Sequence, residues 1–271
     1  MKRALKNLAA LCCAALMLLG SARAEALNVL LIGLDGDGET GRSDTMMLCR
    51  IDEESCEVRL ASFLRDLYVR IPGYGRTRLN AAYVYGGAPL LRQTLEECFG
   101  VTIDRSLTVN FSLLKSLVDD MGGVEITLTQ AEARHLNETL GGAPDLKEGA
   151  QLLDGYQALS YSRIRKIDSD FQRTQRQQNV IRALVERARS LSWISLARLA
   201  VRYLGEVETD LSLGDLSALL PLARQADLSN LQSARVPFEG AYEEAVIDGM
   251  QVLVPDLEAN RAQLAAFWDA P

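Results

Sequence analysis

The sequence predicts an α/β fold in which a mixed central sheet lies between layers of helices. Short apolar runs typical of buried strands alternate with helical segments, and several neighbouring strands are close enough in sequence to pair antiparallel. No linker rich in proline, glycine or serine divides the chain in two. With 271 residues, 48% of them hydrophobic, the chain can bury a large core.

The strands are predicted from their apolar runs. Residues 27–32 (LNVLLI) form a continuous apolar run that ends at Gly33, which is typical of a buried central strand. Residues 45–51 and 57–63 are expected to pair around an acidic turn, and residues 68–71 form a short extended segment. Further strands are expected at residues 101–110, 124–128, 234–237 and 251–254.

Helices are predicted between these strands from capping residues and apolar spacing. Gly100 is expected to end a helix at residues 88–99, and Asp154 and Asp256 are expected to begin two others. The polar segment at residues 130–148 is expected to be a surface loop or lid. Other helices are expected at residues 113–118, 171–189, 193–204 and 214–225.

The first 24 residues are expected to be an export signal peptide or a short N-terminal anchor. Lys2, Arg3 and Lys6 precede an apolar run at residues 8–19, and Ala22-Arg23-Ala24 has the pattern of a cleavage site. The run is shorter than the ~20 residues that usually span a bilayer, which favours a cleaved signal. The predicted location is therefore extracytoplasmic.

Charge and cysteine content exclude several classes of protein. The formal net charge is −7, which argues against nonspecific nucleic-acid binding. His135 is the only histidine, so the chain has no zinc-ligand pattern. Cys49 and Cys56 flank a turn and could form a disulfide across a hairpin, or stay as thiols, while Cys98 is expected to be buried.

An acidic, glycine-rich loop follows the first predicted strand. Asp35 and Asp44 at its two ends are candidate magnesium ligands, since they offer hard oxygen donors at the carboxyl end of a strand. The alternative is an acidic turn in which Asp and Gly serve only the turn geometry. Arg65 and Asp66 form a second charged group at a strand end, or a plain terminal salt bridge.

A basic stretch at residues 161–178 stands out in this acidic chain, with Arg163, Arg165, Lys166, Arg173 and Arg176. A cap at Ser169 or Asp170 would place Arg173, Arg176 and Gln177 on one face of the first turns of a helix. Guanidinium groups beside a helix N-terminus suit oxyanions such as phosphate. The alternative is a solvated basic face with salt bridges to neighbouring acids.

The motifs in this order resemble the LytR-CpsA-Psr family of envelope proteins over about residues 28–186: LLIGLD, GRSDTMML, SFLRDLYVRIPG, TRLNAAYVYGG, VNF, LVDDMGGVEI, LDGYQALSYSRIR and DSDFQRTQRQQ. The resemblance implies a layered α-β-α fold with an apolar lipid groove. It also implies a magnesium-dependent phosphotransferase that moves a glycopolymer from a polyprenyl-pyrophosphate carrier to peptidoglycan. Teichoic acid and capsule are both possible polymers.

The resemblance assigns roles to individual residues. Asp35 and Asp44 match the magnesium-associated aspartates, and Arg65 matches a catalytic arginine that also binds pyrophosphate. Asp37 and Asp44 are the candidate bases. The pyrophosphate-binding set is expected to be Arg42, Arg65, Arg78, Arg163, Arg165, Arg173 and Gln177. Asp66, Asn80 and Asp170 fit positions expected to be structural.

Three features depart from the family pattern. Asp37 stands where the family commonly has an arginine, which adds a negative charge beside the expected metal. Lys166 stands where a histidine often follows the second arginine of the R-x-R pair. A clear transmembrane anchor with a spacer, usual in the family, is also lacking.

The chain is therefore expected to comprise a signal or anchor at residues 1–24, a catalytic domain at 25–190, and an extension of helices and short strands at 191–271 packed on it. The expected partners are the lipid-linked glycopolymer, peptidoglycan and the membrane surface. Two alternatives stay open: a polyprenyl-pyrophosphate hydrolase, and a non-catalytic protein that binds the carrier lipid or the wall. A transcriptional attenuator conflicts with the export signal and the net charge.

Overall fold

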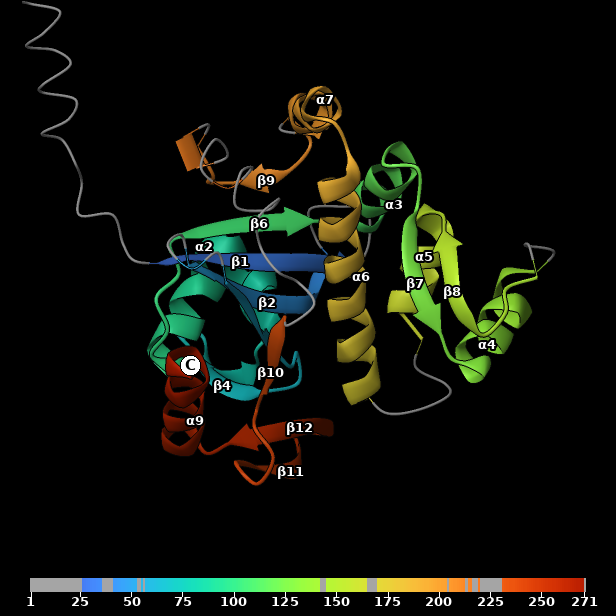
Figure 1. Ribbon diagram of the computed structural model, residues 1–271. Coiled ribbons are helices and arrows are strands. Elements are labelled where there is room, and N and C mark those ends of the chain that lie inside the picture. Colours follow the sequence, from blue (N-terminus) through green and yellow to red (C-terminus); the bar gives the residue numbers. More distant parts are fainter. Residues whose placement is uncertain are drawn as a thin grey trace, which may run out of the picture.

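The computed structural model describes residues 26–35, 41–52, 55, 57–141, 145–164, 170–203, 205–212, 214–215, 219 and 231–270. Figure 1 shows the arrangement of its helices and strands. The predicted export signal lies outside the described residues, as do Asp37, Cys56 and Arg165. Most of the helix expected at residues 214–225 also lies outside them.

A six-stranded mixed sheet forms the centre of the fold, in the order β10-β3-β2-β1-β6-β9. β1 pairs antiparallel with β2 and parallel with β6, while β3 pairs antiparallel with β2 and parallel with β10. The predicted mixed sheet is therefore confirmed. The strands are β1 (Ala26–Asp35), β2 (Arg42–Asp52), β3 (Val58–Phe63), β6 (Arg105–Val109), β9 (Glu208–Thr209) and β10 (Gln232–Val236).

Helices cover both faces of this sheet. Side chains alternate along each strand, so both faces carry apolar residues that the helices bury. Leu30 and Ile32 of β1 belong to the core that includes α2 (Ala81–Phe99) and α9 (Leu257–Asp269). Leu31 points the other way and packs in the cluster that contains Ile181 and Val185 of α6 (Asp170–Ser190). The predicted layers of helix, sheet and helix are thus present.

A second, smaller core lies beyond α6. In Figure 1, α6 stands between the central sheet and the antiparallel pair β7 (Val124–Leu128) and β8 (Gly149–Leu153). Side chains from β7, β8 and α6 pack there with α5 (Gly155–Ser162) and α4 (Gln130–Leu140). α3 (Phe111–Asp120) packs against α5. α6 therefore belongs to both cores.

The expectation of a loop at residues 130–148 is wrong for its first part, which is the helix α4. Thr129 and Glu132 form a capping box, in which the Glu132 N–H donates to Thr129 Oγ1 at 3.3 Å and the Thr129 N–H donates to Glu132 Oε2 at 2.9 Å. Leu136 is fully buried and supplies the apolar side of an otherwise polar helix. The capping-box residues Thr129 and Glu132 indicated a helix start, but the polar composition of residues 130–148 favoured the prediction of a loop.

The helix ends predicted at Asp154, Asp256 and Gly100 are confirmed, whereas the helix predicted from residue 88 begins at Ala81. Asp154 Oδ1 accepts a hydrogen bond from the Gln157 N–H at 2.8 Å, and Asp256 Oδ1 accepts one from the Ala259 N–H at 3.0 Å. Gly100 ends α2 with a φ of 68°, a left-handed conformation that favours glycine.

The C-terminal part of the chain completes the central sheet at both edges, through β9 and β10. It also adds the hairpin of β11 (Tyr242–Ile247) and β12 (Met250–Pro255), which lies beside the pair β4 (Tyr68–Ile71) and β5 (Gly75–Arg78). The amphipathic helix α7 (Trp193–Tyr203) follows α6. Across the described residues, no helix has the length and apolar character needed to cross a bilayer.

Asp215 ties the segment after β9 to β6 and makes folding stability depend on pH. Its Oδ2 accepts a hydrogen bond from Arg105 Nε at 2.8 Å and another from the Ser212 N–H, and these contacts lower the pKa of Asp215 to about 2. A carboxyl group with a lowered folded-state pKa stabilises the fold above its unfolded pKa of about 4, and this contribution is lost as the pH falls towards 2.

We therefore expect Asp215→Asn to lower the free energy of unfolding at pH 7, with a difference from the unmodified protein that shrinks between about pH 4 and pH 2. Urea unfolding at a series of pH values measures this difference. A deficit that stayed constant down to pH 2 would contradict the assignment, because it would show that the loss does not come from the ionised carboxylate.

Candidate functional site

An apolar groove with a volume of about 320 Å³ runs between the central sheet and helices α3, α5 and α6. Its position follows from the alternation along β1, which turns Leu31 towards α6. An aliphatic lining of this kind suits a hydrocarbon chain. The aliphatic residues of the lining are Leu31, Ile32, Leu107, Val109, Leu114, Leu117, Leu159, Val180, Ile181, Leu184 and Val185.

The lining becomes polar towards the start of α6. Arg173 and Gln177 lie in the first turns of this helix, and Leu184 lies on the same face later, because spacings of four and eleven residues return to one side. The axial distance from Arg173 to Val185 is about 18 Å. Asp44 and Arg163 line the groove with Arg173 and Gln177. One helix thus presents an apolar wall that ends in a guanidinium group.

A chain of charged side chains lies at the same edge of the sheet. Arg65 Nη1 is 2.9 Å from Asp44 Oδ1, and Arg65 Nε is 3.3 Å from Asp66 Oδ2. Because β2 runs antiparallel to β3, the start of β2 and the end of β3 meet, which brings Asp44 to Arg65. The side chains of Asp44 and Arg65 are only 13% and 22% exposed, so each holds the other in place.

A second acid and base pair lies at the end of β1. Arg163 Nη2 is 3.5 Å from Asp35 Oδ1, and the Arg163 guanidinium lies 4.4 Å from the centre of the Phe111 ring. Arg42 is exposed at the start of β2, opposite Asp35 in the strand register. Asp35, Arg42 and Arg163 therefore belong to the same edge of the sheet as Arg65.

Arg173 and Arg176 of the basic stretch do not lie on the same surface. Arg173 lines the groove, although only 3% of its surface is exposed to solvent. Arg176 is buried on the other side of α6, where its Nε lies 2.7 Å from Glu132 Oε1 and its Nη1 donates to the Ile164 carbonyl. The expectation that one face carries both is therefore wrong.

Arg78, predicted to bind pyrophosphate, contacts groups of the protein. Its Nε is 3.3 Å from Asp66 Oδ1, and its Nη2 donates to the carbonyl of Gln251 at 2.6 Å. These contacts give it a positioning role between the strand-end aspartate and the β11–β12 hairpin. Phosphate binding by Arg78 stays a prediction, as it does for Arg165, which lies outside the described residues.

Sequence reasoning missed several residues that belong to the site. Asn110 and Phe111 line the groove and come from the VNF motif, whose position after a strand was the available signal. Asn110 Oδ1 caps α3 by accepting a hydrogen bond from the Leu113 N–H at 2.8 Å, which fixes Phe111 beneath Arg163. For the hairpin next to Arg65, only the strand at residues 251–254 was predicted, although the Asp248-Gly249 turn, with positive φ at both residues, was an available signal.

Asp35 and Asp44 fit a magnesium site. Mg²⁺ is usually held by one or two carboxylates together with waters and substrate phosphates, and these two aspartates lie at the same end of the paired strands β1 and β2. Within the described part of the chain, no cluster of three or more His, Cys, Asp or Glu side chains has metal-binding geometry. A magnesium ion at Asp35 and Asp44 would bind carboxylates that also form ion pairs, Asp35 with Arg163 and Asp44 with Arg65.

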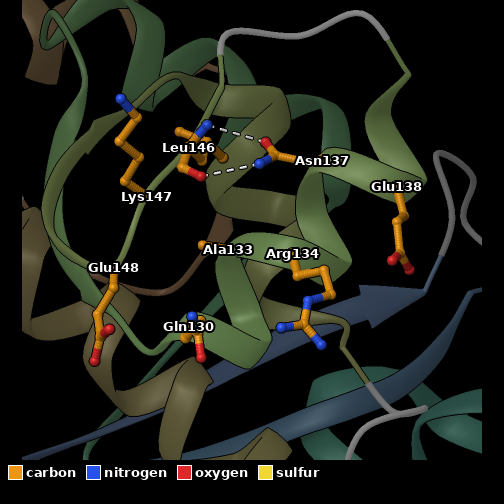
Figure 2. A pocket seen from close by; sticks show the side chains of 8 residues that line it. All are labelled: Gln130, Ala133, Arg134, Asn137, Glu138, Leu146, Lys147 and Glu148. Atoms are coloured by element: carbon orange, nitrogen blue, oxygen red, sulfur yellow. Dashed lines mark hydrogen bonds between the residues drawn. The ribbon is translucent and has the colours of Figure 1, made fainter.

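A larger hollow of about 530 Å³ lies at α4, apart from these residues. Figure 2 shows its lining, in which Asn137 bonds both the N–H and the carbonyl of Leu146 and so ties the following segment to the helix. Charges of both signs, such as Arg134 and Glu138, are scattered around it. It contains none of the predicted site residues, so its size does not make it the functional site.

Comparisons with known proteins identify the family of the chain. The model of the LytR_cpsA_psr family matches residues 14–266. The polyisoprenyl-teichoic acid–peptidoglycan teichoic acid transferase TagU of Oceanobacillus iheyensis is 38% identical over 247 residues, which are 88% of this chain and 74% of that protein. TagT of Bacillus subtilis, which carries the same functional name, is 34% identical over 205 residues, which are 73% of this chain and 64% of TagT.

Solved structures show the same fold. TagT bound to LIIa-WTA has a TM-score of 0.76 and 27% identity, with 90% of this chain and 91% of that chain covered. TagT with bound octaprenyl pyrophosphate lipid has a TM-score of 0.71 and 25% identity, with 90% of each chain covered. The family match over most of the chain and these relatives lead to one conclusion: the chain belongs to the LytR-CpsA-Psr family.

Proposed function

We propose that this protein transfers a glycopolymer from a polyprenyl-pyrophosphate carrier to peptidoglycan. The observation that carries the proposal is the apolar groove that ends in Arg173 and Arg163, beside the paired Arg65 and Asp44. This arrangement suits a molecule with a long hydrocarbon tail and a diphosphate head. It also agrees with the functional names of TagT and TagU and with the octaprenyl pyrophosphate bound by TagT.

The chemistry of the proposed reaction is phosphoryl transfer. A hydroxyl oxygen of the acceptor forms a bond to the sugar-side phosphorus, the bond from that phosphorus to the bridging oxygen breaks, and polyprenyl phosphate leaves with the bond electrons. The acceptor proton passes to a base. The candidates are Asp44, which lies within the described residues, and Asp37, which lies outside them. Arg65, Arg163 and Arg173 stabilise the charge on the phosphate oxygens.

A magnesium ion held by Asp35 and Asp44 would offset part of the same negative charge when bound. The proposed location is the outer side of the cytoplasmic membrane, because both the lipid carrier and peptidoglycan are reached there. The predicted export signal supports this location.

Filling the groove is expected to weaken use of a long-chain carrier. Leu184→Trp would place a larger side chain against the lipid tail, and each CH₂ group excluded from an apolar site costs about 0.8 kcal/mol. The expected result is a KM at least about tenfold higher for a long prenyl chain and little changed for a water-soluble short chain. Ile194→Trp on the exposed face of α7 is the matched control, since Ile194 is 73% exposed.

The transfer reaction itself is tested with the full chain and a synthetic polyprenyl-pyrophosphate glycan, by following release of polyprenyl phosphate with and without magnesium and peptidoglycan. Release that requires both would support the transferase. Release without the acceptor would favour the hydrolase, and tight lipid binding without release would favour the non-catalytic binding protein.

A further inference from the structure

Another cavity, also of about 530 Å³ but distinct from the hollow at α4, adjoins the groove. Arg173 lines both this cavity and the groove. Its other walls come from Arg65 and Asp66 after β3 and from the β11–β12 hairpin. We propose that this hairpin pocket binds a sugar ring beside the reacting phosphate, with Glu244 and Gln251 as hydrogen-bonding partners of its hydroxyl groups. The proposal rests on the transferase function and extends it to the carbohydrate.

The strand register places the polar groups of the hairpin on the side of the pocket. Glu244 pairs with Leu253 and Val246 pairs with Gln251, so these four side chains share one face of the antiparallel pair. All four line the pocket. Glu244 and Gln251 are exposed and Val246 is 70% exposed, so this face is open to a ligand.

The opposite face of the hairpin carries the pair Ala245 and Val252. Val252 is 2% exposed, and both residues also contribute to the pocket lining. Glu243 alternates with Glu244 and pairs with Val254 in the strand register. The two adjacent glutamates therefore differ in the face that they occupy, although both are exposed.

The hairpin is fixed to the segment that carries Arg65. The Leu253 N–H donates to the Asp66 carbonyl at 3.0 Å, and Arg78 Nη2 donates to the Gln251 carbonyl at 2.6 Å. Arg78 also lies 3.3 Å from the Asp66 carboxylate, which contacts Arg65. The pocket therefore has a set position relative to Arg65. The Gln251 contact uses its backbone carbonyl and not its side-chain amide.

The pocket combines groups that suit a sugar. Carboxylate, amide and guanidinium groups exchange hydrogen bonds with hydroxyls, and the apolar side chains of Leu64, Phe171 and Val246 offer surface to the C–H face of a ring. Phe171 is held in place by the Arg235 guanidinium, 3.5 Å from the ring centre. The pocket lining pairs two carboxylates, Glu244 and Asp66, with two guanidinium groups, Arg65 and Arg173, so its formal charges cancel and it suits a ligand of neutral hydroxyl groups.

The sugar could come from the donor glycan or from the peptidoglycan acceptor, and calorimetry with three soluble probes separates the two. The probes are a glycosyl methyl diphosphate without a prenyl tail, an uncrosslinked muropeptide, and a short prenyl diphosphate without a sugar. The full chain is compared with the double variant Glu244→Ala, Gln251→Ala and with the single variant Glu243→Ala as the matched control.

The double variant is expected to raise the Kd of at least one sugar probe about tenfold or more, while the Kd of the prenyl diphosphate and all values for Glu243→Ala stay within about twofold. Weaker binding of the glycosyl diphosphate assigns the pocket to the donor, and weaker binding of the muropeptide assigns it to the acceptor.

Unchanged sugar binding in the double variant, an equal loss in Glu243→Ala, or no binding of either sugar by the unmodified chain would overturn the pocket assignment. Prenyl diphosphate binding reports separately on the proposed function, because its absence in the unmodified chain would remove the lipid carrier itself.

Discussion

Replacing Arg65 by alanine is expected to lower the kcat of polymer transfer about 10²–10³-fold. The guanidinium is held by Asp44 at 2.9 Å and by Asp66 at 3.3 Å, so it is oriented before the substrate arrives. An oriented donor that meets charge developing on a phosphate oxygen contributes about 3–4 kcal/mol to the transition state, as single-donor losses in other enzymes indicate. Arg65 lines the hairpin pocket and also a small pocket that it shares with Asp44, Arg173 and Gln177.

Release of polyprenyl phosphate under saturating substrate measures this effect, and thermal unfolding checks that the variant is folded. Arg65→Lys keeps the charge but lacks the planar fork, so we expect an intermediate loss. Arg134→Ala is the matched control, because Arg134 is an exposed arginine on α4, away from the groove. If Arg65→Ala kept more than about a tenth of the normal kcat, Arg65 would not act in the transition state.

Breaking the buried ion pair of Arg176 and Glu132 is expected to lower the free energy of unfolding by about 3–5 kcal/mol. The two side chains are 3% and 9% exposed, and their closest atoms, Arg176 Nε and Glu132 Oε1, are 2.7 Å apart. Either alanine variant would leave one charge without its partner in the interior. Arg176→Ala also removes the hydrogen bond of 3.2 Å that Arg176 Nη1 donates to the carbonyl of Ile164, the middle residue of the R-x-R segment.

Urea unfolding of Glu132→Ala and Arg176→Ala, together with a double variant that replaces both by leucine, tests this account. We expect the double variant to lose less than either single variant, since apolar residues can replace a buried pair without an unpaired charge. Arg202→Ala is the control, because its ion pair with Asp120 lies at the surface, with Arg202 57% exposed, and is expected to contribute about 1 kcal/mol or less. A loss near that value for Arg176→Ala would contradict the structural role.

The residues at these strand ends could be found from the sequence because the pairing of β2 with β3 is local. Asp44 lies near the start of β2, next to the strand that ends before Arg65, and a short turn makes neighbouring strands run antiparallel. Their ends therefore meet at one edge. The family motifs then added roles that spacing alone left open, such as the choice between a phosphate site and a solvated basic face.

Helical spacing could not decide which arginines face the groove. Arg173 and Arg176 are one turn apart, so periodicity places them close together on the helix surface. The structure separates them because α6 packs against the sheet on one side and against α4 and α5 on the other, and Glu132 supplies a buried partner only on the second side. Two arginines only three residues apart therefore have different roles, since Arg173 lines the groove and Arg176 forms a buried ion pair.

By itself, the sequence determined the alternation of strands and helices, the helix caps at Asp154 and Asp256, and the charged residues that follow the strands. These features depend on propensities and contacts within a few residues. Only the tertiary structure decided that β12 lies against the segment after β3, where the Leu253 N–H bonds the Asp66 carbonyl from far along the chain. Such a contact depends on the packing of the whole fold, because short strands with little side-chain pattern carry no local signal for the partner that they will meet.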